Sequence, residues 1–366
     1  MSTQQNELKY FNAFNLFPEI GTIRFKKLLS YFPNLETAWQ SPFQEFIQAG
    51  LDEKISQKIC EERNKINPDK EFEKIAKQGI EIITIQNSSY PKILKEIYDP
   101  PAILYIKGKF KPEDDFCLAI IGTRKPTSYG IQVVTDLTHK LSTAGLTIVS
   151  GLARGIDTIA HKSCLSANGR TIAVIGSGID PPSIYPQINR KLAEQISDNG
   201  AIISEYPIGT QAMPYHFPAR NRIISGLSLG VLVIEAAQKS GTFLTANHAL
   251  SQNRQVFAVP GQIYSPNSAG PNNLLKMGAK LVSEAQDVLE ELNLSSAVEY
   301  KEARKIIPDN HEEKLILEIL STEPIHIDKI IFRTKLDTAT ASSTLTLMEM
   351  KGKIRNLGGM MYVIAR

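Results

Sequence analysis

Residues 117–124 read CLAIIGTR. A short apolar run that ends at a glycine is typical of a buried strand in a parallel sheet. Similar runs recur, and helical segments separate them. The expected strands are residues 118–121, 146–149, 171–175, 201–204, 231–234, 255–259 and 280–282, and the expected helices include residues 130–143, 156–167, 189–198 and 242–253. This alternation predicts an α/β fold, with an extended Rossmann-like parallel sheet over residues 117–283.

The flanking segments divide the remaining chain. Residues 1–67 predict an N-terminal helical domain of the SAM or helix-hairpin-helix kind, and the turn from Phe17 to Gly21 precedes one of its helices. In such a module the helix start either binds a DNA phosphate or serves packing alone. Residues 68–116 form a bridge into the core, with strands expected at 80–85 and 102–106.

The C-terminal part predicts a linker and a small domain. Residues 284–310 are polar and read as the linker. Residues 311–366 show three helical segments and then a hairpin, which is the order of a winged helix. This domain has 8 Lys and Arg residues against 7 Asp and Glu. The near balance favours protein contacts or a weak DNA contact over strong DNA binding.

Charge points to an anionic ligand of the core. The whole chain carries a net charge of +3, yet residues 117–283 hold 14 Lys and Arg residues against 7 Asp and Glu. A basic core indicates an anionic partner, unless these charges simply belong to solvated helix faces.

The scattered Cys60, Cys117 and Cys164 indicate neither a disulfide framework nor a metal site, and they favour a cytoplasmic setting. No apolar run is long enough for a membrane span, and residues 1–10 do not resemble a secretion signal.

The first two strand ends carry phosphate-binding residue types. Gly122 lets the backbone approach a phosphate, Thr123 offers a hydroxyl group, and Arg124 offers a bidentate guanidinium. At the next strand end, Gly151, Arg154 and Gly155 precede a helix whose N–H groups can face an anion. Asp157 and His161 follow one turn apart. They are either acid–base machinery or, as we favour, a helix cap and a packing histidine.

Later strand ends carry an aromatic residue with arginines. Phe217 can stack a base while Arg220, Asn221 and Arg222 hold the flanking phosphates, which is the combination expected for single-stranded nucleic acid. Alternatively, Phe217 is a core residue and one arginine pairs with Glu205 or Glu235. Lys239, Ser240 and Gly241 follow the next strand, and a loop over 260–273 comes last. Because all these loops follow strands, we expect them to meet at one rim of the sheet.

Signatures of catalysis and of cofactors are missing from the sequence. There is no P-loop, no dinucleotide-binding G-x-G-x-x-G and no nucleophile with an obvious base. We therefore expect a binding site with no catalytic residue, no metal ion and no cofactor such as NAD or ATP.

Taken in order, these motifs resemble those of the DprA/Smf family of DNA-processing proteins. The resemblance rests on Gly122-Thr123-Arg124, Ser150-Gly151-Leu152-Ala153-Arg154-Gly155-Ile156-Asp157, Ile184-Tyr185-Pro186, Ser204-Glu205-Tyr206, Phe217-Pro218-Ala219-Arg220-Asn221-Arg222, Ser240-Gly241-Thr242 and Val259-Pro260-Gly261. The resemblance implies a cytoplasmic homodimer that binds and protects single-stranded DNA in natural transformation and loads the recombinase RecA onto it. It implies a DNA pocket at Arg124, Phe217, Arg220 and Arg222. A basic residue is also expected after Tyr185-Pro186. Gln187 holds that place, so Arg190 or Lys191 is the candidate.

Two other functions stay open. Nucleotide phosphoribohydrolases of the LOG type share arginines and glycine-rich loops on this rim, but the glutamate that they use does not stand beside Lys239-Ser240-Gly241-Thr242. A regulator that senses a nucleotide through the core and reads duplex DNA through the winged helix is the third possibility, and the near-neutral C-terminal domain argues against it.

Overall fold

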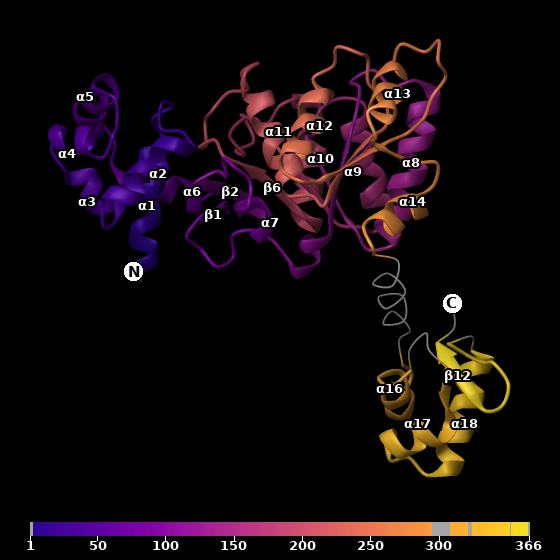
Figure 1. The fold of residues 1–366 in the computed structure, drawn as a ribbon. Coiled ribbons are helices and arrows are strands. Elements are labelled where there is room, and N and C mark those ends of the chain that lie inside the picture. The colour runs from indigo at the N-terminus through magenta and orange to yellow at the C-terminus, as the bar shows by residue number, and fades with distance from the viewer. Residues whose placement is uncertain (1–2, 295–307, 321–323, 352, 365–366) are drawn as a thin grey trace. The chain divides into compact units, whose positions relative to one another are not determined.

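The computed structural model describes residues 3–294, 308–320, 324–351 and 353–364 (Figure 1). The chain forms two compact units, Met1–Ala285 and Gln286–Arg366. No helix in these described ranges is long and apolar enough to cross a membrane.

A sheet of nine described strands lies at the centre of the first unit, in the order β1-β2-β6-β5-β4-β3-β7-β8-β9. The strands are β1 Glu81–Thr84, β2 Ile103–Gly108, β3 Cys117–Ile121, β4 Thr147–Ser150, β5 Thr171–Val174, β6 Ala201–Ser204, β7 Gly230–Val233, β8 Gln255–Ala258 and β9 Lys280–Leu281. All neighbours from β6 to β9 are parallel, which confirms the predicted Rossmann-like α/β fold. The strand order reverses at β3, because β4 pairs on one side of it and β7 on the other.

Helices cover both faces of this sheet. They are α7 Lys92–Lys95, α8 Ser128–Thr143, α9 Ile156–Ser166, α10 Arg190–Asn199, α11 His216–Gly226, α12 Thr242–Ser251 and α13 Ala269–Lys276, with short 3-10 turns η2 Pro112–Phe116 and η3 Gln187–Asn189. Successive strand residues point to opposite faces. Ile203 thus joins a core cluster with α7, α11, α12 and α13, whereas Ile202 joins one with α10 and the N-terminal helices. Burial on both faces explains why the strands are apolar throughout.

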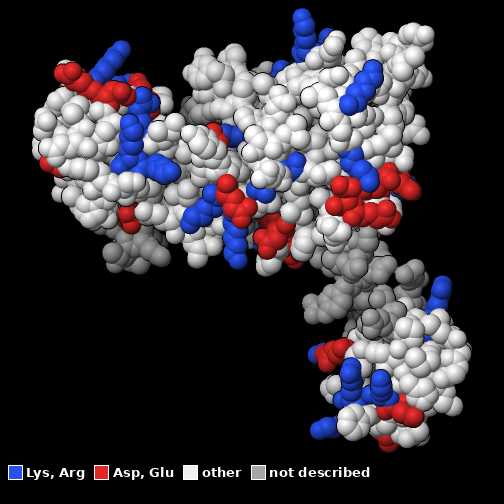
Figure 2. All heavy atoms as spheres, in the orientation of Figure 1, with Lys and Arg blue, Asp and Glu red and all other residues white. Residues whose placement is uncertain are grey.

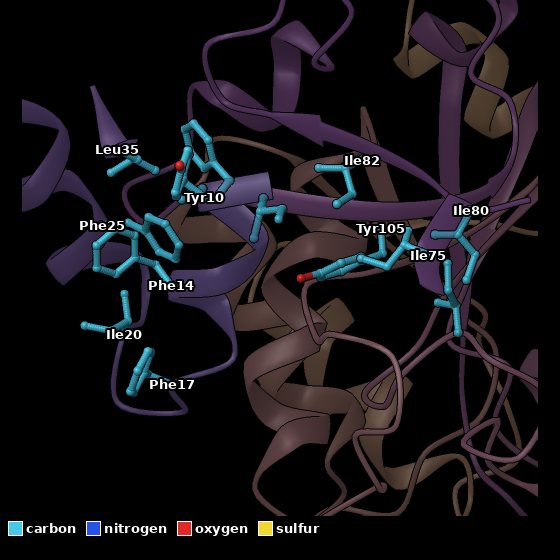
Figure 3. Packing of buried hydrophobic residues seen from close by; sticks show 14 of the residues in the cluster. Tyr10, Phe14, Phe17, Ile20, Phe25, Leu35, Ile75, Ile80, Ile82 and Tyr105 are labelled. Carbon is cyan, nitrogen blue, oxygen red and sulfur yellow. The ribbon is translucent and has the colours of Figure 1, made fainter. Parts of the chain in front are cut away.

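The N-terminal helices pack on the sheet through a shared core (Figure 3). They are α1 Thr3–Asn15, α2 Thr22–Tyr31, α3 Leu35–Gln40, α4 Phe43–Gln48, α5 Glu53–Glu62, η1 Arg63–Lys65 and α6 Pro68–Ala76. Phe14 and Phe25 belong to the same buried cluster as Ile82 of β1 and Tyr105 of β2. The Tyr105 hydroxyl donates to Asn12 Oδ1 at 2.7 Å and accepts from Asn15 Nδ2 at 3.2 Å. Two asparagines of α1 therefore bind the hydroxyl of a buried tyrosine that belongs to β2.

Residues 68–116 do more than bridge the helical domain and the core. The strands expected in this segment are present, as β1 and β2. They pair antiparallel with each other, and β2 pairs antiparallel with β6, so they extend the main sheet at one edge. The division at residue 67 stays a prediction.

Two cations near the turn that precedes α2 are paired with carboxylates. Lys58 Nζ lies 2.7 Å from Glu19 Oε1, and Arg24 Nη2 lies 2.8 Å from Asp52 Oδ2. A paired cation gives up an ion pair when it binds a phosphate, which favours the packing role for this turn over the DNA-binding role.

The second unit has the expected winged-helix order, α16 His311–Leu317, β10 Ile325–His326, α17 Ile327–Thr334, α18 Thr338–Met350, β11 Ile354–Asn356 and β12 Met361–Ile364. The expected two-stranded hairpin is part of a three-stranded sheet, because β10 pairs with β12 through Ile325 and Tyr362. A buried carboxylate, Glu313, binds Lys351 and Lys353 at 2.8 and 2.6 Å.

The predicted linker over 284–310 is in part helical. Helix α14 spans Ala285–Glu291, and it buries the apolar residues Ala285, Val288 and Leu289. Acidic side chains gather near this helix in Figure 2. Residues 295–307 of the predicted linker lie outside the described residues.

Candidate nucleic-acid interface

A cleft of about 830 Å³ lies at the carboxyl ends of β3, β4 and β7, where the strand order reverses. Open α/β sheets bind their ligands at such a reversal. The lining residues are Ile121, Gly122, Thr123, Arg124, Lys125, Ala153, Asp157, Tyr185, Pro214, Phe217, Pro218, Arg220, Asn221, Ile224, Ser240, Gly241, Thr242, Leu244, Thr245 and Asn267. The loops thus meet at one rim, as expected from their places after strands.

Glu235 holds the loop that follows β3. Its carboxylate accepts from the backbone N–H of Thr127 at 2.9 Å and from the hydroxyl of Thr127 at 2.5 Å, and its carbonyl accepts from Thr123 N at 2.7 Å. A Cβ on Gly122 would lie 2.6 Å from Ile156 Cγ1, so only glycine fits there. The loop therefore presents Thr123 and Arg124 from a fixed backbone. Sequence reasoning treated Glu235 only as a possible arginine partner, and it missed this supporting role.

An exposed arginine and two aromatic rings lie together at the cleft. The guanidinium carbon of Arg124 lies 5.7 Å from the ring centroid of Phe217. The Tyr185 ring lies 5.7 Å from the same ring, inclined by 45°. This spacing permits a cation–π contact and leaves ring faces that nucleobases can stack on. Tyr185 belongs to a recognised motif, but the sequence did not single it out as a site residue.

The segment with Phe217 is the start of helix α11 and is not a loop. Pro218 does not prevent this, because proline is tolerated in the first turn of a helix. Phe217, Arg220, Asn221 and Ile224 follow the spacing i, i+3, i+4 and i+7, so they share one face of α11, and all four line the cleft. Recognising that spacing would have assigned this face from sequence.

Arg220 lies buried at the base of the cleft. Its Nη1 donates to the carbonyl of Val174, and its guanidinium fills the space that a side chain at Gly151 would need. Burial lowers the pKa of Arg220 to about 10, while the nearby Asp157 opposes that shift. Arg220 therefore keeps its charge at neutral pH.

Asp157 and His161 have separate structural partners. Asp157 Oδ2 accepts from the backbone N–H groups of Gly151 at 3.0 Å and of Ala153 at 3.4 Å. His161 Nδ1 lies 2.7 Å from Thr171 Oγ1, and burial lowers the His161 pKa to about 3, so the ring is neutral. These contacts favour structural roles over acid–base machinery, and they support the packing histidine. Asp157 is not the expected helix cap, because the N-cap position of α9 is Gly155 and the Asp157 carboxylate binds N–H groups of the preceding loop.

Arg222 points away from the cleft. It lies two residues after Arg220, which places it about 200° further round the helix. Its guanidinium pairs with Glu205 and lies 3.3 Å from Asp99 Oδ2. The alternative in which one arginine pairs with Glu205 thus describes Arg222, and the expected place of this residue in a DNA pocket finds no support in the geometry.

The structure divides the expected site residues into groups. Those in the cleft are Gly122, Thr123, Arg124, Phe217, Arg220, Asn221, Ser240 and Gly241, with Gly151 in contact with Arg220. Arg154, Gly155 and Lys191 line a second pocket. Arg190 donates to the Pro182 carbonyl at 3.0 Å, and Lys239 is exposed outside both pockets. Lys125 and Asn267 line the cleft without having been predicted, and Asn267 Nδ2 donates to the Lys125 carbonyl at 3.0 Å.

Two family models match this chain: DNA recombination-mediator protein A over residues 81–293, and the DprA winged helix domain over residues 301–360. Protein Smf of Synechocystis is 34% identical over 98% of this chain and 98% of its own length. DNA processing protein DprA of Bacillus subtilis is 47% identical over 59% of this chain and 72% of its own. The chain belongs to the DprA/Smf family of DNA-processing proteins.

Two solved structures of this family are similar to the chain. The X-ray structure of DprA from Streptococcus pneumoniae superposes with a TM-score of 0.65 at 36% identity, covering 78% of this chain and 96% of that one. DNA processing protein A from Helicobacter pylori, studied for its single-stranded DNA binding mode, gives a TM-score of 0.52 at 34% identity, over 58% of this chain and 96% of that one.

Proposed function

We propose that this protein binds single-stranded DNA in the cleft at the end of β3, without catalysing a reaction. One observation carries the proposal. An exposed arginine, Arg124, stands over the ring of Phe217, with Tyr185 beside it. Among the described residues Arg124 has no ion-pair partner, and stacking surfaces next to such a cation suit a strand whose bases are free. The Helicobacter pylori relative, which was studied for its single-stranded DNA binding mode, supports the choice of ligand.

The proposal is tested by titrating a labelled oligonucleotide with the whole protein, using fluorescence anisotropy. Replacing Arg124 by alanine should weaken binding roughly 10-fold or more, because hydrogen bonds to charged groups contribute about 1.5–3 kcal/mol. The slope of log affinity against log salt should also fall by about 0.7. Lys109→Ala is the matched control, because Lys109 is exposed and lines neither pocket. Equal affinity of the wild type and Arg124→Ala would contradict the assignment.

Recombinase loading and the dimer are the finer parts of the proposal, and the family resemblance supports them. We propose that a cytoplasmic homodimer protects incoming single strands and loads RecA onto them. The purified protein should shorten the lag of RecA-dependent ATP hydrolysis on DNA coated with single-strand-binding protein, and it should sediment as a dimer. An unchanged lag would contradict the loading role. Release of free base from AMP would instead revive the hydrolase alternative.

A further inference from the structure

A second pocket, of about 570 Å³, lies in a groove between α9 and α10. Its lining residues are Arg154, Gly155, Thr158, Lys162, Ile188, Asn189, Lys191, Leu192 and Gln195. Thr158 and Lys162 stand one turn apart on α9, and Lys191 and Gln195 stand one turn apart on α10. Each helix therefore gives one face to the groove.

The groove is basic and its cations are unpaired. Arg154, Lys162 and Lys191 are all exposed, and no acidic residue lines the pocket. Within the described part of the chain, none of these three side chains takes part in an ion pair or a hydrogen bond. Lys140 of α8, by contrast, pairs with Asp136 one turn away. Like charges brought together without counterions repel one another, and a bound anion removes that cost.

One fixed loop separates the groove from the cleft. Ala153 lines the cleft, and the next two residues, Arg154 and Gly155, line the groove. Asn189 at the start of α10 donates to the Leu152 carbonyl and to Thr158 Oγ1, both at 2.8 Å. These bonds tie the loop to both walls of the groove. The two pockets therefore keep a constant relative position and open on either side of a single turn of backbone.

We propose that the groove is a second phosphate-binding site for the same nucleic-acid strand, which leaves the cleft across the 152–156 loop. This inference rests on the proposed function. Lys162, which neither the motifs nor the cleft includes, is the residue that it newly assigns to binding. Continuity with the cleft favours nucleic acid over an acidic peptide. The aromatic rings of the adjacent cleft suit nucleobases, and an acidic peptide carries none. A strand that spans both pockets contacts more phosphates than one confined to the cleft.

The consequence is a dependence on strand length. Single-stranded DNA sites in other folds cover about 4 to about 16 nucleotides. The wild type should gain affinity between oligothymidylates of roughly those two lengths. Lys162→Gln should bind the shorter strand like the wild type and lose part of the gain on the longer one. Its salt slope on the longer strand should fall by about 0.7, so raising the salt fourfold should cost about 2.6-fold less affinity than in the wild type.

A gain-of-charge variant tests the groove in the opposite direction. Gln195→Lys adds a cation to the same face, so it should tighten binding of the longer strand alone and steepen its salt slope by about 0.7. Lys109→Gln and Gln78→Lys are the matched controls, because both positions are exposed and line neither pocket. Melting temperatures of all four variants establish that they are folded.

The outcomes separate the two proposals. If the wild type binds neither strand, the proposed function fails. If it binds both strands but Lys162→Gln and Gln195→Lys behave as their controls at each length, the groove is not a strand site. Equal loss on short and long strands would likewise overturn the inference. A third outcome would also overturn the inference. If the affinity of the wild type does not depend on strand length, and an acidic peptide displaces the longer strand from the wild type but not from Lys162→Gln, the groove binds a protein segment.

Discussion

Replacing Arg222 should damage the fold and not the binding site. Arg222 is buried and Glu205 is largely buried, with side-chain exposures of 8% and 15%. Arg222→Met keeps the volume of the side chain but leaves the Glu205 carboxylate buried without its partner. Removing one member of a buried pair costs about 3–5 kcal/mol in the free energy of unfolding. For a unit of this size, about 2 °C per kcal/mol applies, so the melting temperature should fall by roughly 6–10 °C.

The loss should depend on pH and be repaired by a second substitution. Burial raises the pKa of Glu205, and Arg222 opposes that rise. Without Arg222 the pKa in the folded state rises further. A carboxyl group whose pKa is higher in the folded state than in the unfolded chain destabilises the fold only above the unfolded-state pKa, which is about 4.3 for glutamate. Above that pH the unfolded chain releases the proton more readily than the folded protein does. The deficit should therefore be larger at pH 8 than at pH 5. Adding Glu205→Gln should recover at least half of it at pH 8.

The assay follows thermal unfolding by circular dichroism, with oligonucleotide anisotropy measured on the same samples at 25 °C. Arg222→Met should bind DNA like the wild type where it is folded, whereas Arg124→Ala should melt like the wild type and bind weakly. An unchanged melting temperature together with lost binding would refute the reasoning, because it would make Arg222 a DNA contact.

Three further predictions follow from single contacts. Phe217→Leu should weaken oligonucleotide binding roughly 5- to 150-fold in anisotropy titrations, since stacking contributes about 1–3 kcal/mol per base, and it should leave the salt slope unchanged. Hydrogen bonds from Lys351 and Lys353 lower the pKa of Asp309 to about 2, so its contribution to stability is present above about pH 4 and lost as the pH falls toward 2; Asp309→Asn should melt with a weaker pH dependence over that range. Gly155→Ala should lower the melting temperature more than Gly209→Ala, because both glycines have a positive φ but only Gly155 would bring a Cβ against the carbonyl oxygen of Thr123.

The sequence was most informative where a residue type has a single structural role, as apolar residues have in a buried strand. The parallel strands could be predicted because burial on both faces demands apolar runs. Strands β1 and β2 could be predicted as strands, yet their place at the sheet edge depends on pairing with β6, about a hundred residues along the chain, and local pattern does not specify such a partner.

The destination of each arginine was harder to predict. Arg220 and Arg222 stand in one motif, and residue type alone suggests the same use for both. Their roles separate only because α11 turns them to opposite sides, one toward the cleft and the other toward Glu205. The helical period predicts the side on which each arginine lies once the helix is recognised. The helix was not recognised from the sequence, because Pro218 and the polar residues around it are typical of a loop.

The shared tyrosine between α1 and β2 has a consequence for trimming this chain. The family model for the core begins at residue 81, which invites a fragment with that start. Such a fragment would lack Asn12 and Asn15, leaving the fully buried hydroxyl of Tyr105 without either amide. It would also uncover an apolar sheet face next to an edge strand, a combination that promotes self-association. Aggregation of that fragment would result from the loss of the N-terminal helices that cover the sheet, and it should not be taken as a property of the DNA-binding rim.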